Sequence, residues 1–191
     1  MHFINHLRQL AAVLLLAATL PLQAQNIGDL QIDPQAVEAL RDSAVEVGAT
    51  LLQRAIADSR AQALRAGVQP IPPQMRAKLL GYYPAALLDR VRYRVGGGSD
   101  QSLQLNVIQY GDQAAITLEE VVVFARQADA LNHDALWAHE LWHVRQMQDW
   151  GLPEFARRYA RDYRMVEGEA DRAALQYQAW VRQRGTPTGS R

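Results

Sequence analysis

His139 and His143 lie four residues apart in an apolar-rich stretch from Asp134 to Trp150, DALWAHELWHVRQMQDW. Apolar residues recur on several faces of a helix drawn through this stretch, which predicts a largely buried helix. Asp134 suits its N-cap, and Gly151 is a natural stop. Side chains four apart lie on one helix face, so both imidazoles can aim at one point. This pattern constrains the fold, because buried imidazoles need partners.

One metal ion per chain, bound by both imidazoles, would give each buried histidine a partner. Zinc is the expected ion, since neutral imidazole and carboxylate suit it and a catalytic zinc site keeps one position open for water. Glu140 follows the first histidine, and this position predicts a general base that takes a proton from water attacking a carbonyl. The alternative is a chance match in which the histidines only cap the helix or fill space beside it. A sheet predicted just before the motif and a ligand candidate after it favour the metal site.

The first 24 residues indicate a secretory signal peptide. Arg8 supplies a basic start, Leu10 to Leu20 is an apolar run of signal-core length, and Ala24 is a small residue at a plausible cleavage point. The run is too short to span a bilayer. We therefore expect an exported protein, periplasmic or secreted, without a membrane span once the signal is cleaved. An uncleaved anchor is the alternative.

The composition excludes several classes of site. Lys and Arg total 20 and Asp and Glu total 20, and no basic cluster stands out, so a nucleic-acid partner is not expected. The chain has no cysteine, which excludes disulfides, lipid attachment at cysteine, thiolate metal ligands and a cysteine nucleophile. An exported chain of this kind must be held together by packing, to which a metal can contribute.

Residues 25–70 are predicted to form an N-terminal helical region and linker. Pro34 to Ala66 is rich in helix formers with apolar residues at helical spacing. Asp33 suits the N-cap and Gly67 the stop, while Gly48 could kink or divide the helix. The proline-rich segment Gln69 to Pro73 is predicted to be a linker.

Residues 71–184 are expected to form one α+β domain that begins with two short helices, Gln74–Leu80 and Pro84–Arg90. Short β-branched or aromatic runs between residues 91 and 124 predict a small, mostly antiparallel sheet; the runs are VRYRV, SLQLNVIQY, AAITL and VVVF. Gly111-Asp112 is a predicted hairpin and Glu119-Glu120 a tight connection.

A second helical region follows the motif helix. Pro153 can open it, and the helical pattern continues to about Arg182, with a bend expected near Met165 to Gly168. Residues 185–191 are predicted to be a disordered tail.

The segment EGEAD, from Glu167 to Asp171, resembles the second motif of gluzincins, the thermolysin-like metallopeptidases, which pair His-Glu-x-x-His with a downstream Glu-x-x-x-Asp on a second helix. The resemblance implies that Glu167 is the third zinc ligand. It also implies that Asp171 accepts a hydrogen bond from a zinc-binding histidine, His139 being the expected donor, which would fix the orientation of that ring.

Other interpretations of these acids remain open. Glu169 is a competing ligand, although the residue four positions later is Ala173 and not an acid. Glu169 could instead lie on a solvated helix face, and Asp171 could form an ion pair with Arg172 or Arg164.

A second resemblance covers Ile71 to Ala174, on the segments IPPQMRAKLLGYYPAALLDRVRYRVG, AITLEEVVVF, HELWHVRQ, GLPEFARRYARDYR and EGEAD. They look like the metallopeptidase-like core domain associated with extracellular contractile injection systems. The two resemblances together imply a zincin-like fold, with the small sheet packed on an active-site helix and a second ligand-bearing helix. This chain differs by its export signal and long N-terminal helix. Trp142 stands where a small polar residue is expected, and core packing is its expected role.

Two functions follow from these patterns. The first is a zinc metalloendopeptidase acting on a peptide or protein substrate, which an edge strand, AAITL or VVVF, could hold by strand addition. Its oxyanion would need a stabilising group, for which Tyr159, Tyr163, Arg164 and His133 are candidates. The second is a non-catalytic, zinc-containing interaction or assembly module of the cell envelope.

Overall fold

The computed structural model describes residues 33–96 and 114–185, which form an α+β fold. The elements in chain order are α2 (Pro34–Ala66), β1 (Gln69–Pro70), α3 (Pro73–Leu79), α4 (Ala85–Arg90), β2 (Arg92–Val95), β3 (Ala115–Leu118), β4 (Val121–Phe124), α6 (Gln127–Asn132), α7 (Asp134–Trp150) and α8 (Leu152–Gly185). The predicted signal peptide, the strand SLQLNVIQY, the Gly111-Asp112 hairpin and the tail beyond Gly185 lie outside the described residues.

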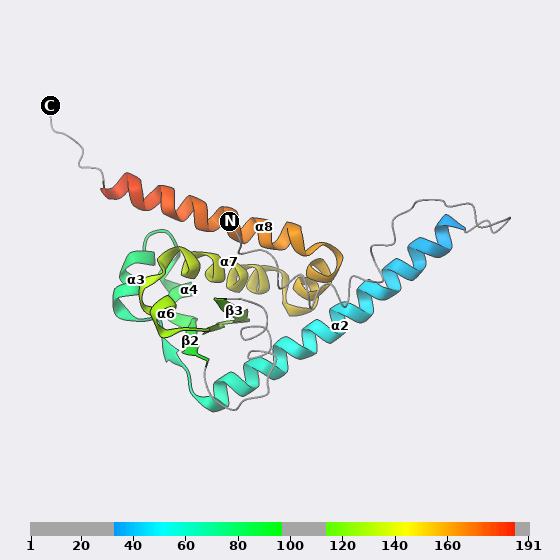
Figure 1. The fold of residues 1–191 in the computed structure, drawn as a ribbon, viewed down its shortest axis with the longest axis horizontal. Helices are drawn as coiled ribbons and strands as arrows, with labels where there is room; N and C mark the ends of the chain where they lie inside the picture. The colour runs from blue at the N-terminus through cyan, green and yellow to red at the C-terminus, as the bar shows by residue number, and fades with distance from the viewer. Residues whose placement is uncertain (1–32, 97–113, 186–191) are drawn as a thin grey trace.

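Helix α2 runs unbroken through Gly48, so this glycine does not divide it. Asp33 caps the helix as predicted, since its Oδ1 accepts a hydrogen bond from the Gln35 amide at 2.9 Å. The helix extends along one side of the molecule and packs against α8 and the β3–β4 hairpin (Figure 1). Arg60 in α2 ties it to this hairpin through an ion pair with Glu120.

The sheet is small and mixed, with strand order β1-β2-β4-β3. The pairs β1–β2 and β3–β4 are antiparallel, whereas β2 and β4 pair in parallel. Within the predicted linker, Gln69 and Pro70 form the short strand β1, because their backbone pairs with Tyr93 and Arg92. Glu119 and Glu120 make the tight β3–β4 turn, where Glu119 adopts a φ of 57°.

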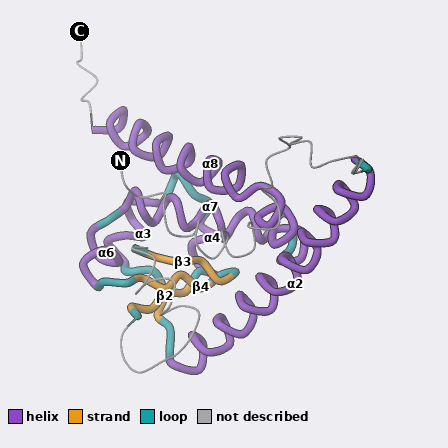
Figure 2. The backbone as a smooth tube through the Cα atoms, turned by 45° about the vertical axis from the view of Figure 1, so that its right-hand side comes forward, coloured by secondary structure: helices purple, strands orange, loops and turns teal. Residues whose placement is uncertain are grey.

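Strand β4 is buried along its whole length and separates two apolar cores. Its side chains alternate between sheet faces. Val122 and Phe124 join the core formed with α3, α4 and α7, whereas Val121 and Val123 join the core formed with α2 and the first part of α8. The sheet is thus covered by helices on both faces (Figure 2).

Helix α7 begins with a cap that differs from the predicted one. His133 is the N-cap, and its Nδ1 accepts a hydrogen bond from the Leu136 amide at 2.9 Å. The predicted cap, Asp134, is the first helical residue, and its carboxylate accepts a bond from the Tyr177 hydroxyl in α8. Gly151 ends α7 with a φ of 78°, a conformation that glycine adopts without the strain of a side chain.

The long C-terminal helix α8 is divided at Asp162, where the backbone is not helical (φ −153°, ψ 81°). The Asp162 carboxylate accepts a hydrogen bond from the Met165 amide at 3.2 Å and so caps the second half of the helix. The bend predicted near Met165 to Gly168 is therefore wrong in position. The Asp162 side chain offers the backbone a hydrogen bond that competes with continuation of the helix. Gly168 lies in regular helix.

The other boundaries differ little from the sequence prediction. The two short helices begin and end within one residue of the expected positions, and α8 starts at Leu152 instead of Pro153. The additional helix α6 precedes α7 and is joined to it by a hydrogen bond from the Trp137 indole to the Ala130 carbonyl. None of the described helices combines the length and apolar character that crossing a bilayer requires.

Candidate metal centre

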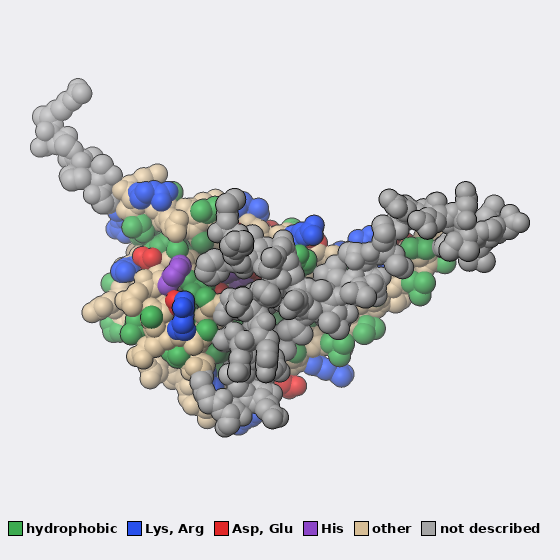
Figure 3. Space-filling view, viewed as in Figure 1, with side chains coloured by type: hydrophobic (Ala, Val, Ile, Leu, Met, Phe, Trp, Pro, Cys, Tyr) green, Lys and Arg blue, Asp and Glu red, His purple; other side chains and the backbone are tan. Residues whose placement is uncertain are grey.

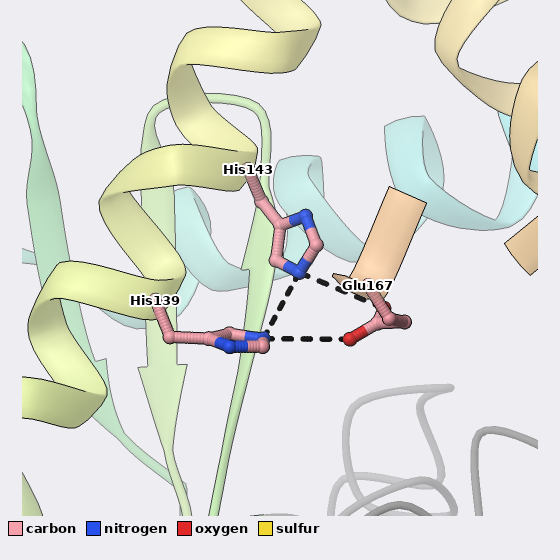
Figure 4. A group of neighbouring side chains, drawn as sticks. All are labelled: His139, His143 and Glu167. Carbon is pink, nitrogen blue, oxygen red and sulfur yellow. Dashed lines mark hydrogen bonds and ion pairs between the residues drawn. The ribbon is translucent and has the colours of Figure 1, made fainter. Parts of the chain in front are cut away.

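Three side chains from two helices converge on one point (Figure 4). His139 and His143 project from successive turns of α7, and Glu167 projects from α8 just beyond the Asp162 break. One ligand atom from each lies within 4.8 Å of the others. The structure thus brings together the three residues predicted to bind a metal, and they form a possible metal site.

The donor atoms have spacings that suit a single ion. The two histidine Nε2 atoms are 3.1 Å apart, and the Glu167 oxygens are 3.4 Å from His139 Nε2 and 3.6 Å from His143 Nε2. Ligand atoms on a tetrahedral zinc ion, at about 2.0–2.1 Å from the metal, are roughly 3.3–3.4 Å apart. The observed separations lie on both sides of that value. Two imidazoles and one carboxylate are also a donor set typical of catalytic zinc.

His139 has a carboxylate on each side. Its Nδ1 lies 3.2 Å from Asp171 Oδ1, and its Nε2 faces Glu167. Burial opposes a positive charge on this ring, but hydrogen bonds to Asp171 and Glu167 and the nearby charge of Glu140 outweigh it and raise the pKa of His139 to about 10. Without a metal, the site therefore holds a proton on His139. A metal ion would have to displace that proton.

Glu167 is held by Tyr159 as well as by the histidines. The Tyr159 hydroxyl donates a hydrogen bond to Glu167 Oε1 at 3.0 Å. Burial alone would raise the pKa of Glu167, but His143 and His139 reverse that effect and lower it. Burial and the Glu167 charge raise the pKa of Tyr159 well above its usual range, so its hydroxyl stays a donor. The third candidate ligand is thus a carboxylate in a defined position.

Glu140, the predicted general base, is almost fully buried at 4% exposure. Its Oε2 accepts a hydrogen bond of 2.6 Å from the Thr117 hydroxyl, which also lies 3.2 Å from the Glu140 carbonyl oxygen. Thr117 belongs to β3, so a strand of the sheet and the motif helix meet at this carboxylate. One Glu140 oxygen is therefore bound to Thr117.

Glu169, the competing ligand candidate, has another partner. Its Oε2 accepts a hydrogen bond from Gln146 Nε2 at 2.9 Å, and Gln146 Oε1 lies 2.8 Å from His143 Nδ1. The grouped ligand atoms include Glu167 and not Glu169. Glu169 is therefore linked to the candidate centre through Gln146 and His143.

The remaining predicted residues have varied surroundings. His133 uses its ring nitrogen to cap α7, and Arg164 donates a hydrogen bond to the Tyr163 hydroxyl at 3.3 Å. Of the four oxyanion candidates, Tyr159 is hydrogen-bonded to a candidate ligand, Glu167. Trp142 is half-buried rather than part of the core, and the Arg145 guanidinium lies 5.0 Å from its ring centre.

Sequence reasoning missed Thr117 and Gln146. Gln146 lies three residues after His143, so its place on the same helix face was a usable signal. Thr117 had no comparable signal, because its approach to Glu140 depends on how β3 packs against α7.

Residues 70–151 match the family described as the eCIS core domain. The matched segment runs from β1 to the end of α7 and contains His139, Glu140 and His143, but it stops before Glu167. The resemblance expected over Ile71 to Ala174 is thus supported as far as Gly151. Neither a curated protein nor a solved structure matches this chain.

Proposed function

We propose that this protein is an exported zinc metallopeptidase of the gluzincin type, with a zincin-like arrangement of sheet and helices. The convergence of His139, His143 and Glu167 within 4.8 Å is the observation that carries the proposal. Glu140 supports it, since a buried carboxylate on the same helix as both histidines is suited to act as a general base.

In the proposed reaction His139, His143 and Glu167 would hold a zinc ion, which would polarise the peptide carbonyl and activate the attacking water. Glu140 takes the proton of the attacking water and passes it to the leaving amine. Thr117 keeps one Glu140 oxygen engaged, so that the other is available for this transfer. Tyr159 donates its one hydroxyl proton to Glu167, so its proposed role is to hold the third ligand in position.

A peptide is the proposed substrate because of the position of β3. In the described sheet β3 is the outermost strand next to β4, and Thr117 of β3 contacts the proposed base. An extended peptide that pairs with the outer side of β3 would run close to Glu140. The bond to be cleaved would then lie beside the metal site.

The test is metal analysis combined with cleavage of a denatured-protein or peptide library. We expect about one zinc per chain, and we expect Glu140→Gln to retain zinc but lose cleavage by about 100-fold or more. Glu38→Gln, an isosteric change at an exposed glutamate of α2, is the matched control and should retain activity. Equal cleavage by Glu140→Gln and wild type would refute the mechanism.

A non-catalytic envelope module is the second candidate function. The family match favours it, because the matched segment excludes Glu167 and its name refers to a core domain of injection systems. The outer face of α2 also carries exposed apolar side chains, Leu40, Val47 and Leu51, in the region where green patches follow this helix in Figure 3. Zinc-loaded protein that cleaves no peptide, and that binds an envelope partner through these three residues, would favour this function over the first.

A further inference from the structure

Gln146 connects the candidate metal centre to the body of α8. Its side chain is buried, with 3% exposure, and makes three hydrogen bonds. Oε1 lies 2.8 Å from His143 Nδ1, while Nε2 lies 2.9 Å from Glu169 Oε2 and 3.2 Å from the Val166 carbonyl oxygen. Both groups facing Nε2 belong to α8, whereas His143 and Gln146 belong to α7.

These partners decide which way the Gln146 amide points. A carbonyl and a carboxylate can only accept hydrogen bonds here, so the amide NH₂ must face Val166 and Glu169. The amide oxygen is then the atom that faces His143, and it can only accept. His143 must therefore carry its proton on Nδ1. In the neutral ring this leaves the Nε2 lone pair directed at His139 and Glu167.

We propose that Gln146, oriented by Glu169 and the Val166 carbonyl, positions His143 for metal binding by holding it in the tautomer with a free Nε2. Glu169 is then a positioning residue and not a ligand. This inference rests on the metal site of the proposed function but does not require peptidase activity. Because Asp171 does the corresponding task for His139, each histidine has its own hydrogen-bond partner.

The proposal predicts a specific order of effects on zinc affinity. Gln146→Leu removes the acceptor for Nδ1–H and should weaken zinc binding by about 10- to 100-fold, the usual effect of losing such an outer partner. Gln146→Glu keeps an acceptor for His143 but places an oxygen against Glu169 and the Val166 carbonyl, so it should also weaken binding. Adding Glu169→Gln to Gln146→Glu restores a donor opposite an acceptor and should recover at least part of the lost affinity.

The experiment measures zinc affinity by competition with a chromophoric chelator, and records the visible absorption spectrum of the cobalt-substituted protein. Gln148→Leu, an exposed glutamine on the same helix, is the matched control and should behave as wild type in both measurements. Circular dichroism of the metal-free variants checks that each one is folded. If Gln146→Leu does not fold, the comparison of Gln146→Glu with the double variant Gln146→Glu/Glu169→Gln provides the test.

The outcomes separate this inference from the peptidase proposal. Weaker zinc binding and an altered cobalt spectrum in Gln146→Leu, with recovery in the double variant, support the positioning role. Wild-type affinity and spectrum in Gln146→Leu, or no recovery in the double variant, overturn it whether or not the protein cleaves peptides. Tight zinc binding without any cleavage would refute the peptidase and leave the role of Gln146 intact.

Discussion

The hydrogen bond between Thr117 and Glu140 allows a sharp test of how the sheet supports the motif helix. Thr117 is buried, with 6% exposure, and its hydroxyl donates to Glu140 Oε2 at 2.6 Å, a length typical of a hydroxyl bound to an ionised carboxylate. Thr117→Val replaces the hydroxyl by a methyl group of similar size and keeps a residue that suits a strand. The change therefore removes the hydrogen bond with little change in packing.

The expected magnitude follows from burial and charge. A hydrogen bond to a charged group contributes about 1.5–3 kcal/mol, and the loss of Thr117 leaves a buried carboxylate without this donor. The free energy of unfolding should fall by that amount, which corresponds to a decrease in melting temperature of about 3–12 °C for a domain of this size. In a Glu140→Leu background the same change should cost about 1 kcal/mol or less, because the residue 140 carbonyl is the remaining acceptor.

The assay is a double-mutant cycle by urea unfolding in the presence of a chelator, so that metal binding does not contribute. Thr50→Val is the matched control, since this exposed threonine bonds only a carbonyl of its own helix, and it should change stability by less than about 0.5 kcal/mol. Equal costs of Thr117→Val in the presence and absence of the Glu140 carboxylate would refute the reasoning.

Three further predictions concern the metal, the proton and the core. Chelation should lower the melting temperature by about 5–15 °C, because a metal present at 100 to 1,000 times its Kd stabilises the folded protein by about 2.7–4.1 kcal/mol. Calorimetry measures this difference, and it should be absent in His143→Ala. In metal-free protein the pKa of His139, raised from 6.5 to about 10, gives stability that is complete below pH 6.5 and declines as the pH rises towards 10. The urea midpoint of the metal-free protein should decline with pH in the same way. A wild-type midpoint that does not change with pH, or a pH dependence in His139→Gln as steep as in wild type, would contradict this prediction. Tyr83→Phe removes a buried 2.6 Å hydrogen bond to the Ala138 carbonyl and should lower the free energy of unfolding by about 0.5–1.5 kcal/mol. Urea titration measures this change, and an unchanged midpoint would contradict the prediction.

Much of the helical structure could be predicted because its causes are local. The apolar periodicity of Pro34 to Ala66, with Asp33 before it and Gly67 after it, predicted a helix that the structure contains with the same bounds. The facing of His139 and His143 is equally local, since four residues are about one helical turn.

The sheet could be predicted only in part. Short β-branched runs indicated strands, and β2, β3 and β4 occur where they were expected. The parallel pairing of β2 with β4 could not be read from these runs, because periodicity reports which side chains share a face and not which strand is the neighbour. The strand β1 was missed for the same reason, since its two residues owe their conformation to pairing with β2.

By itself, then, the sequence determined the motif helix, the face that carries both histidines and the place of Glu140 between them, because helix geometry is set by residues a few positions apart. The resemblance to gluzincins favoured Glu167 over Glu169, but the tertiary structure decides which acid approaches that face. The break at Asp162 and the packing of α8 on α7 bring Glu167 to the histidines and Glu169 to Gln146, although the two acids are only two positions apart. The packing of β3 on α7 joins Thr117 to Glu140. Contacts between residues so distant in the chain depend on the arrangement of whole elements, which no local pattern specifies.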